Sequence, residues 1–170
     1  GNLFDEIPQL AFQDDKCAPI GVFLCATREN AIEAEERFCA LATDTGLVGW
    51  GEATVAPRWS GETRTGCLAA INELIGPAIL GLDPRDTGAA WLRIDDAIRF
   101  NPFTKAAVEM AVWDLAGKAE NAPVYELLGG KAREAVPIKM VVGAFPIEKA
   151  LGLARRFLDW GVGTLKVKVG

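Results

Sequence analysis

The sequence predicts an α+β domain followed by a βαβ unit with two parallel strands. The first part combines a glycine-rich hairpin pattern with the strongest helical pattern of the chain, and the pattern then changes to strand, helix, strand. With 170 residues, half of them hydrophobic, the chain can form a packed core. The change of pattern places the boundary between the two parts near residues 131–135.

The first predicted elements are strands. Pro19–Ala26 has the β-branched and aromatic content of a strand. Residues 29–36 are rich in Ala and Glu and begin like a helix. Because a β-branched run would be expected here in a strand, this stretch leaves the register of the sheet open. From Phe38 onward we favour a hairpin that turns at residues 44–46, because the glycines that follow would be costly in a helix.

Three helices are predicted next. Ser60 is a candidate cap for a helix over about residues 62–74, which Gly76-Pro77 would end. A weaker helical pattern covers residues 83–100. The strongest covers residues 101–123, with Thr104 as its candidate N-cap.

On this last helix, the predicted buried face carries Ala107, Met110, Ala111, Asp114 and Leu115. The acidic residue of that face, Asp114, is better explained by an anchoring hydrogen bond than by catalysis.

The βαβ unit comes after a glycine stop at Gly129-Gly130. Residues 136–143 read as a strand, residues 145–161 as an amphipathic helix, and residues 164–170 as a second strand. Such close succession requires the two strands to be parallel.

Composition excludes several classes of function. The net charge is −5 without a basic run, so no nucleic-acid partner is expected, and the absence of histidine removes Ser-His-Asp triads and most zinc sites. The four cysteines, none in a C-x-x-C pair, are expected to be free thiols of a reducing compartment. No apolar run approaches the ~18 residues of a membrane span, so we expect no membrane partner and a cytoplasmic location.

Lys166 and Lys168 alternate with apolar residues near the end of the chain, so both side chains face one side of the second strand. An exposed edge strand would explain this simply. Parallel strands, however, are normally covered on both faces, so two lysines need a reason. A lysine beside a second ammonium group, in a partly desolvated interior, can act as a base near neutral pH and take a proton from the carbon next to a carboxylate.

The ordered stretches "DTGLVGWGEA", "SGET", "AAVEMAVWDLAGKAENAPVYELLGG" and "LKVKVG" resemble the N-terminal half of the enolase superfamily, in its muconate lactonizing subgroup of mandelate racemase / muconate lactonizing enzyme-like proteins. The resemblance covers roughly residues 38–170. It implies an α+β capping domain over residues 1–131. It also implies that residues 132–170 are the first βαβ unit of a (β/α) TIM-type barrel, truncated after the second barrel strand.

The resemblance also implies roles for individual residues. The K-x-K pair would supply Lys168 as the acid/base catalyst and Lys166 as its electrostatic partner near the substrate carboxylate. Arg58 and Trp59 would belong to one of two loops that choose the substrate, the other lying around residues 8–30. The Mg²⁺ ion of the family would be held by acidic residues on the next three barrel strands, so no metal ligand is expected in this chain.

The leading hypothesis is therefore the N-terminal part of a Mg²⁺-dependent isomerase, cycloisomerase or lyase that acts on a small carboxylate through an enediolate. Muconate-type cycloisomerase, dipeptide epimerase, acylamino-acid racemase and o-succinylbenzoate synthase all stay open. The chain alone is expected to be inactive, with its bare strand edge covered in a homo-oligomer or by a complementing C-terminal chain. The alternatives are a non-catalytic capping-type module, or a naturally truncated and inactive homologue, that binds a partner chain. An unrelated small α/β ligand-binding domain is a third possibility.

Overall fold

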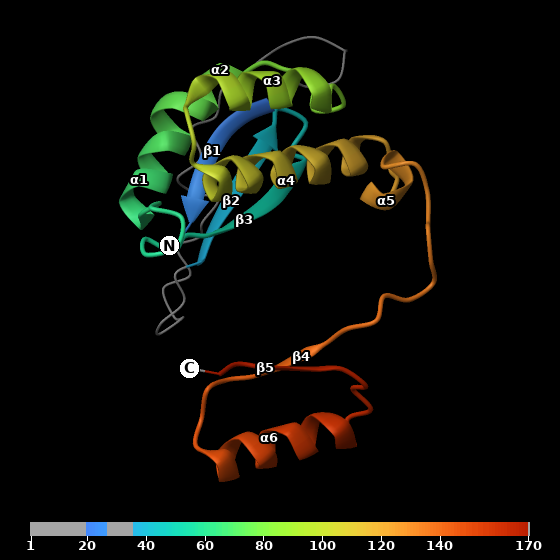
Figure 1. Cartoon of the computed structure of the whole chain (residues 1–170). Coiled ribbons are helices and arrows are strands. Elements are labelled where there is room, and N and C mark those ends of the chain that lie inside the picture. The colour runs from blue at the N-terminus through green and yellow to red at the C-terminus, as the bar shows by residue number, and fades with distance from the viewer. Residues whose placement is uncertain (1–19, 27–35, 170) are drawn as a thin grey trace. The chain divides into compact units, whose positions relative to one another are not determined.

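The structure is a computed structural model that describes residues 20–26 and 36–169, with side chains described from residue 39 onward. The chain divides into two compact units, Gly1–Gly130 and Lys131–Gly170. The first unit contains a three-stranded antiparallel sheet and the second a two-stranded parallel sheet (Figure 1).

The sheet of the first unit has the order β1-β2-β3, formed by Ile20–Ala26, Glu36–Thr43 and Val48–Thr54. β2 and β3 are the predicted hairpin, and the strand predicted at the start of the chain is β1. The turn is closed by a hydrogen bond from the Gly46 amide to the Thr43 carbonyl oxygen at 3.0 Å. Gly46 has a φ of 85°, a left-handed conformation that glycine adopts without strain.

Gly49 and Gly51 of β3 allow a helix to approach the sheet closely. Helix α4 (Pro102–Ala119) packs directly on this strand. A Cβ atom added to Gly51 would lie 1.8 Å from the Ala107 carbonyl oxygen, and one added to Gly49 would lie 2.2 Å from the Ala111 carbonyl oxygen. No side chain fits in either space, so only glycine allows this contact.

The first helical region differs from the prediction at its start. Helix α1 (Arg64–Ala69) is capped by Thr63, whose Oγ1 accepts a hydrogen bond from the Gly66 amide at 3.0 Å. The predicted Ser60 cap is therefore wrong, although serine and threonine are both favoured at this position.

The same region also differs at its end, because Gly76-Pro77 does not stop the helix. It continues through a π-helical segment, η2 (Ala70–Ile75), into α2 (Gly76–Ile79). The Gly76 amide bonds to the Ile71 carbonyl oxygen, five residues back. The proline lies in the first turn of α2, where its missing N–H group is tolerated.

Helix α3 (Thr87–Ala97) confirms the weaker helical pattern and is capped by Asp86, whose Oδ1 accepts from the Ala89 amide at 2.9 Å. The predicted Thr104 cap of α4 is wrong. The cap is Asn101, in a left-handed conformation with a φ of 53°, and Thr104 lies inside the helix, fully buried. Its hydroxyl group donates to the side chain of Glu62.

The core of the first unit lies between the sheet and the helices, which cover one face of it (Figure 1). Three of the predicted core positions on α4 are buried there, but Met110 is 46% exposed, which contradicts its predicted place on the buried face. The buried cluster consists of Cys39, Leu41, Ala53, Val55, Cys67, Ile71, Ile75, Ile79, Ala90, Ile94, Ala107, Val108, Ala111, Val112 and Leu115.

A short helix, α5 (Val124–Leu127), closes the first unit. The predicted glycine stop follows it, with φ angles of 105° at Gly129 and 99° at Gly130. Within the part of the chain that the structure describes, no helix combines the length and apolar character needed to cross a lipid bilayer.

The second unit is a βαβ unit formed by β4 (Met140–Val142), α6 (Ile147–Asp159) and β5 (Leu165–Val167). The strands are parallel, as predicted, but shorter than the pattern suggested. Val142, 1% exposed, and Phe157 of α6, 6% exposed, form the buried centre of the unit.

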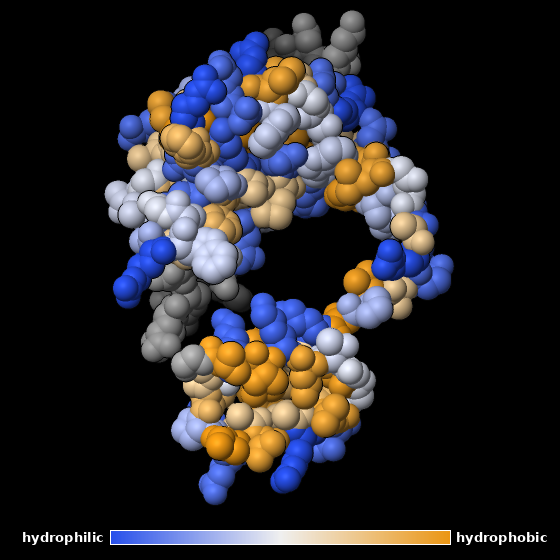
Figure 2. Space-filling view, viewed as in Figure 1, coloured by the Kyte–Doolittle hydropathy of each residue, from blue (hydrophilic) through white to orange (hydrophobic). Residues whose placement is uncertain are grey.

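Apolar side chains also gather on the surface of this second unit (Figure 2). A surface of this kind is normally covered by further protein. The exposed large hydrophobic side chains of this unit are Val136, Ile138, Val141, Phe145, Ile147, Leu151, Leu158, Trp160, Val167 and Val169.

Candidate functional site

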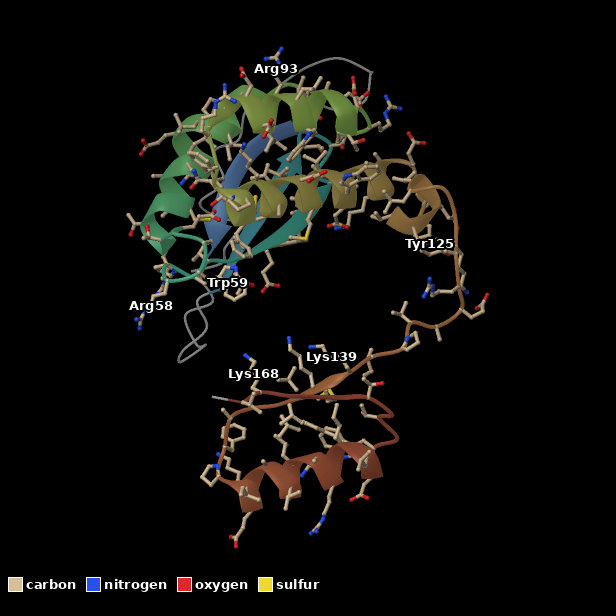
Figure 3. The ribbon with its side chains drawn as sticks, viewed as in Figure 1. Arg58, Trp59, Arg93, Tyr125, Lys139 and Lys168 are labelled. Carbon is tan, nitrogen blue, oxygen red and sulfur yellow. The ribbon has the colours of Figure 1, made fainter. Side chains whose placement is uncertain are left out.

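The two predicted catalytic lysines lie on β5 and directly after it. Val141 of β4 is in register with Lys166, and the Lys168 amide donates to the Val142 carbonyl oxygen at 2.9 Å. Strand alternation places both lysine side chains on one face, with their Cα atoms roughly 7 Å apart. Both side chains are exposed, and Figure 3 shows Lys168 pointing away from α6.

A third lysine, Lys139, shares this face. It directly precedes β4, and Figure 3 shows its side chain on the same side of the two strands as that of Lys168. The sequence gives a weaker signal here than on the second strand, since Lys139 is followed by the apolar residues Met140, Val141 and Val142, and strand alternation alone places it on the face of Val141. We define Lys139, Lys166 and Lys168 as the lysine face.

No counter-charge neutralises the lysine face within residues 131–169. The ion pair found there joins Lys131 to Glu134, and none of the three lysines pairs with a described carboxylate side chain. Because three ammonium groups share one side of two strands, this face has a positive potential and would attract a carboxylate.

The predicted loop residues lie in the first unit, on the turn between β3 and α1 (Figure 3). The amides of Trp59 and Ser60 both donate to the Ala56 carbonyl oxygen at 2.8 Å, and the Gly61 amide donates to that of Pro57 at 3.2 Å. Trp59 is 86% exposed, an unusual position for an indole ring. The turn therefore presents Arg58 and Trp59 at its tip, both exposed.

The structure brings Arg58 and Trp59 together in the first unit, and Lys166 and Lys168 together in the second. The other predicted substrate-selecting loop, around residues 8–30, lies outside the described residues apart from β1.

The described residues do not fit a metal ion. Among residues 20–26 and 36–169 no group of three or more His, Cys, Asp or Glu side chains is arranged to hold one.

Asp114 has the structural role that the sequence favoured. Its Oδ2 accepts a hydrogen bond from the Trp50 amide at 2.8 Å and one from the Lys118 Nζ at 2.7 Å. The same ammonium group donates to the Val48 carbonyl oxygen at 2.6 Å. Asp114 thus anchors α4 to β3.

The shifted pKa values among the described residues also have structural causes. Burial, and secondarily the nearby Cys67, raise the pKa of Cys39 to about 12. The hydrogen bond from Lys105 lowers the pKa of Asp95, and the one from Arg85 lowers that of Asp83. Cys39 and Cys67 are buried thiols, whereas Cys17 and the side chain of Cys25 lie outside the description.

Residues 26–129 match the N-terminal domain family of mandelate racemase / muconate lactonizing enzyme. An L-Lys-D/L-Arg epimerase from Desulforapulum autotrophicum is 30% identical over 142 residues, which are 84% of this chain and 40% of the epimerase. Other curated relatives include racemases, cycloisomerases and dehydratases.

Two solved structures are similar over nearly the whole chain. The first is a muconate lactonizing enzyme from Pseudomonas fluorescens, in complex with muconolactone. It has a TM-score of 0.80 and 26% identity, and the match covers 91% of this chain and 46% of that one. The second is a dipeptide epimerase from Methylococcus capsulatus, in complex with a Mg ion. It has a TM-score of 0.79 and 28% identity, and the match covers 89% of this chain and 44% of that one.

The chain spans less than half the length of these relatives. The family match covers more than half of the chain, and identities near 30% extend over most of the rest of it. The chain belongs to the mandelate racemase / muconate lactonizing enzyme family of the enolase superfamily, of which it contains the N-terminal region.

Proposed function

We propose that this chain is the N-terminal part of an enzyme that removes the proton next to the carboxylate of a small substrate, through an enediolate, in an isomerase or cycloisomerase reaction. The observation that carries the proposal is the lysine face. In a chain of this family, two exposed lysines placed two residues apart, on β5 and directly after it, and paired with no carboxylate within residues 131–169, have the chemistry of a base and an electrostatic partner.

The domain assignment is part of the proposal. Residues 1–131 would be the capping domain and residues 132–170 the first βαβ unit of a (β/α) barrel. Two observations support this assignment. The family match ends at residue 129, beside the boundary between the two compact units, and the second unit exposes the apolar surface that a neighbouring part of a barrel would cover. The remainder of the barrel, from this polypeptide or a complementing chain, or a second copy in a homo-oligomer, would bury that surface.

Within this proposal Lys168 is the acid/base catalyst. It follows the carboxyl end of β5, which is the end of a barrel strand at which active sites form. Lys166, one step deeper on the same face, would stabilise the substrate carboxylate and the negative charge that develops during proton removal.

Arg58 and Trp59 are proposed to contact the variable part of the substrate, because an exposed indole and a guanidinium group at the tip of a short turn are suited to recognition. Magnesium belongs to the proposal because similar solved structures hold it. Its ligands would be residues other than those described.

Exchange of the substrate proton with solvent deuterium tests the proposal. The full-length protein would be incubated with Mg²⁺ in D₂O, and exchange followed by NMR for dipeptides, N-succinyl amino acids and muconolactone, each of which carries a proton on the saturated carbon next to its carboxylate. We expect exchange with at least one of them. Lys168→Ala should abolish exchange from one face of the carbon, a loss of about 10²-fold or more, while Lys166→Ala should weaken exchange without abolishing it.

Lys149→Ala is the matched control, because it removes a lysine from α6 that lies 4.2 Å from the centre of the Phe145 ring. Its exchange rate should equal that of the wild type. A wild-type rate in Lys168→Ala would refute the catalytic assignment, and an unchanged rate in Lys166→Ala would count against its electrostatic role. No exchange with any substrate class would favour the non-catalytic module.

A further inference from the structure

Glu62 is a buried carboxylate, 5% exposed, at the end of the turn that carries Arg58 and Trp59. A charge is costly to bury unless it is paired or hydrogen-bonded. Its Oε1 accepts from the Phe103 amide at 2.9 Å, and its Oε2 accepts from the Thr104 amide at 2.8 Å and the Thr104 hydroxyl group at 2.6 Å. These donors lie in the first turn of α4, where the helix dipole also favours a negative charge.

The bonds of Glu62 connect positions about 40 residues apart in the chain. A helix start needs only a local cap, and a residue next to α4 would serve for that. Since Glu62 comes from the β3–α1 turn instead, the contact fixes that turn to the longest helix of the unit.

The turn has two buried ends. Val55, at its start, is fully buried in the core, and Glu62 ends it on α4. Residues 56–61 between them are closed by their own backbone hydrogen bonds, with an added bond from the Ser60 Oγ to the Ala56 carbonyl oxygen at 3.3 Å. A turn so short and so closed has little freedom except through movement of its ends.

We propose that Glu62 is the positioning residue of this turn: its hydrogen bonds to α4 hold the backbone that places Arg58 and Trp59 for substrate recognition. The inference rests on the proposed function only for the recognition role of these two side chains. The hold of Glu62 on the turn can be tested without a substrate.

The first experiment is limited trypsin proteolysis of the chain under native conditions, with cleavage of the Arg58–Trp59 bond followed by mass spectrometry. Glu62→Gln keeps the side-chain size but places an amide donor against donors of α4. The rate of this cleavage should rise about tenfold or more. Thr104→Val removes one of the three bonds, so its rate should rise less.

Asp86→Ala is the matched control. It also removes a carboxylate that accepts a backbone amide at the start of a helix of the same unit, but the hydrogen bond of Asp86 goes to Ala89 of α3 and not to the turn. Its cleavage rate at Arg58 should stay within about twofold of wild type. The inference is overturned if Glu62→Gln is cleaved at the wild-type rate, or if Asp86→Ala is accelerated equally. Should Glu62→Gln fail to fold, a wild-type rate in Thr104→Val overturns it.

The second experiment measures KM and kcat of the full-length enzyme. Glu62→Gln should raise KM severalfold with a smaller change in kcat, as expected when recognition is lost but the reacting groups stay in place. A raised KM in Trp59→Ala with a wild-type KM in Glu62→Gln overturns the inference. A wild-type KM in both variants overturns the recognition role of the turn, whereas the hold of Glu62 on the turn is decided by the cleavage rates.

Discussion

Gly51→Ala tests the packing of the first unit most directly. The added Cβ would lie 1.8 Å from the Ala107 carbonyl oxygen, 2.8 Å from the Ala107 carbonyl carbon and 3.1 Å from the Ala111 amide nitrogen. All three are backbone atoms of α4, so no side-chain rotation can relieve the clash. Since non-bonded carbon atoms prefer about 3.5 Å or more, the helix would have to move by roughly 1.5 Å.

Overpacking a core costs typically about 1–3 kcal/mol, and more where the surroundings cannot yield. Because the obstacle is a helix backbone whose other residues fill the core, we expect a loss of about 3 kcal/mol in the free energy of unfolding. With a urea m-value of about 1–3 kcal/mol/M, the urea midpoint would fall by about 1–3 M. Far-UV circular dichroism of the chain in urea measures it.

Gly88→Ala is the control for this substitution. A Cβ at Gly88, in the first turn of α3, would lie 3.7 Å from the Asp86 Oδ1, an ordinary contact. Alanine in a helix is favoured over glycine, so this variant should match the wild type or gain up to about 1 kcal/mol. A midpoint for Gly51→Ala within experimental error of that of the wild type would refute the close approach of β3 and α4.

Two further predictions concern the same unit. Asp114→Ala should lower the free energy of unfolding by about 1–2 kcal/mol, because the Trp50 amide loses its acceptor and Lys118 loses one of its two. Urea titration measures the loss against Glu73→Ala, an exposed position, and equal midpoints would contradict the anchoring role. The pKa of Cys39, raised from 9.0 to about 12, means that its thiol stays protonated at neutral pH and that its thiolate fraction is roughly a thousandfold lower than in the unfolded chain. Iodoacetamide labelling at pH 8, mapped to Cys39 by mass spectrometry, should therefore be far slower in the native chain than in urea, and similar rates would contradict its burial.

The elements that the sequence predicts well are those set by local chemistry. The hairpin follows from the turn at Asp44 to Gly46 and from glycines that a helix disfavours. The βαβ unit follows from a change of hydrophobic period, and the alternation of Lys166 and Lys168 places them on one face without any knowledge of their neighbours.

The errors occur where distant contacts decide. Ser60 and Thr63 are both good caps, and the choice between them goes with the burial of Glu62 on α4, 41 residues away. Thr104 likewise lies within α4 instead of capping it, and its hydroxyl group donates to Glu62. Gly76-Pro77 is a helix stop by local rules, and a π-helical turn accommodates it instead. No local sequence pattern predicts contacts between residues this far apart in the chain.

The anchor of α4 on β3 has a consequence for how this chain behaves beside others. β3 is an edge strand of its sheet, and its Val48 carbonyl and Trp50 amide accept and donate the bonds to Lys118 and Asp114. An edge strand with open groups invites a strand from another molecule to join the sheet. In this sheet two of the outward-facing backbone groups of β3 are already hydrogen-bonded to side chains of α4. A strand from another molecule could pair with them only by displacing the Lys118–Asp114 ion pair. The contact that anchors α4 on β3 therefore also disfavours the addition of a strand from another molecule at this edge of the sheet.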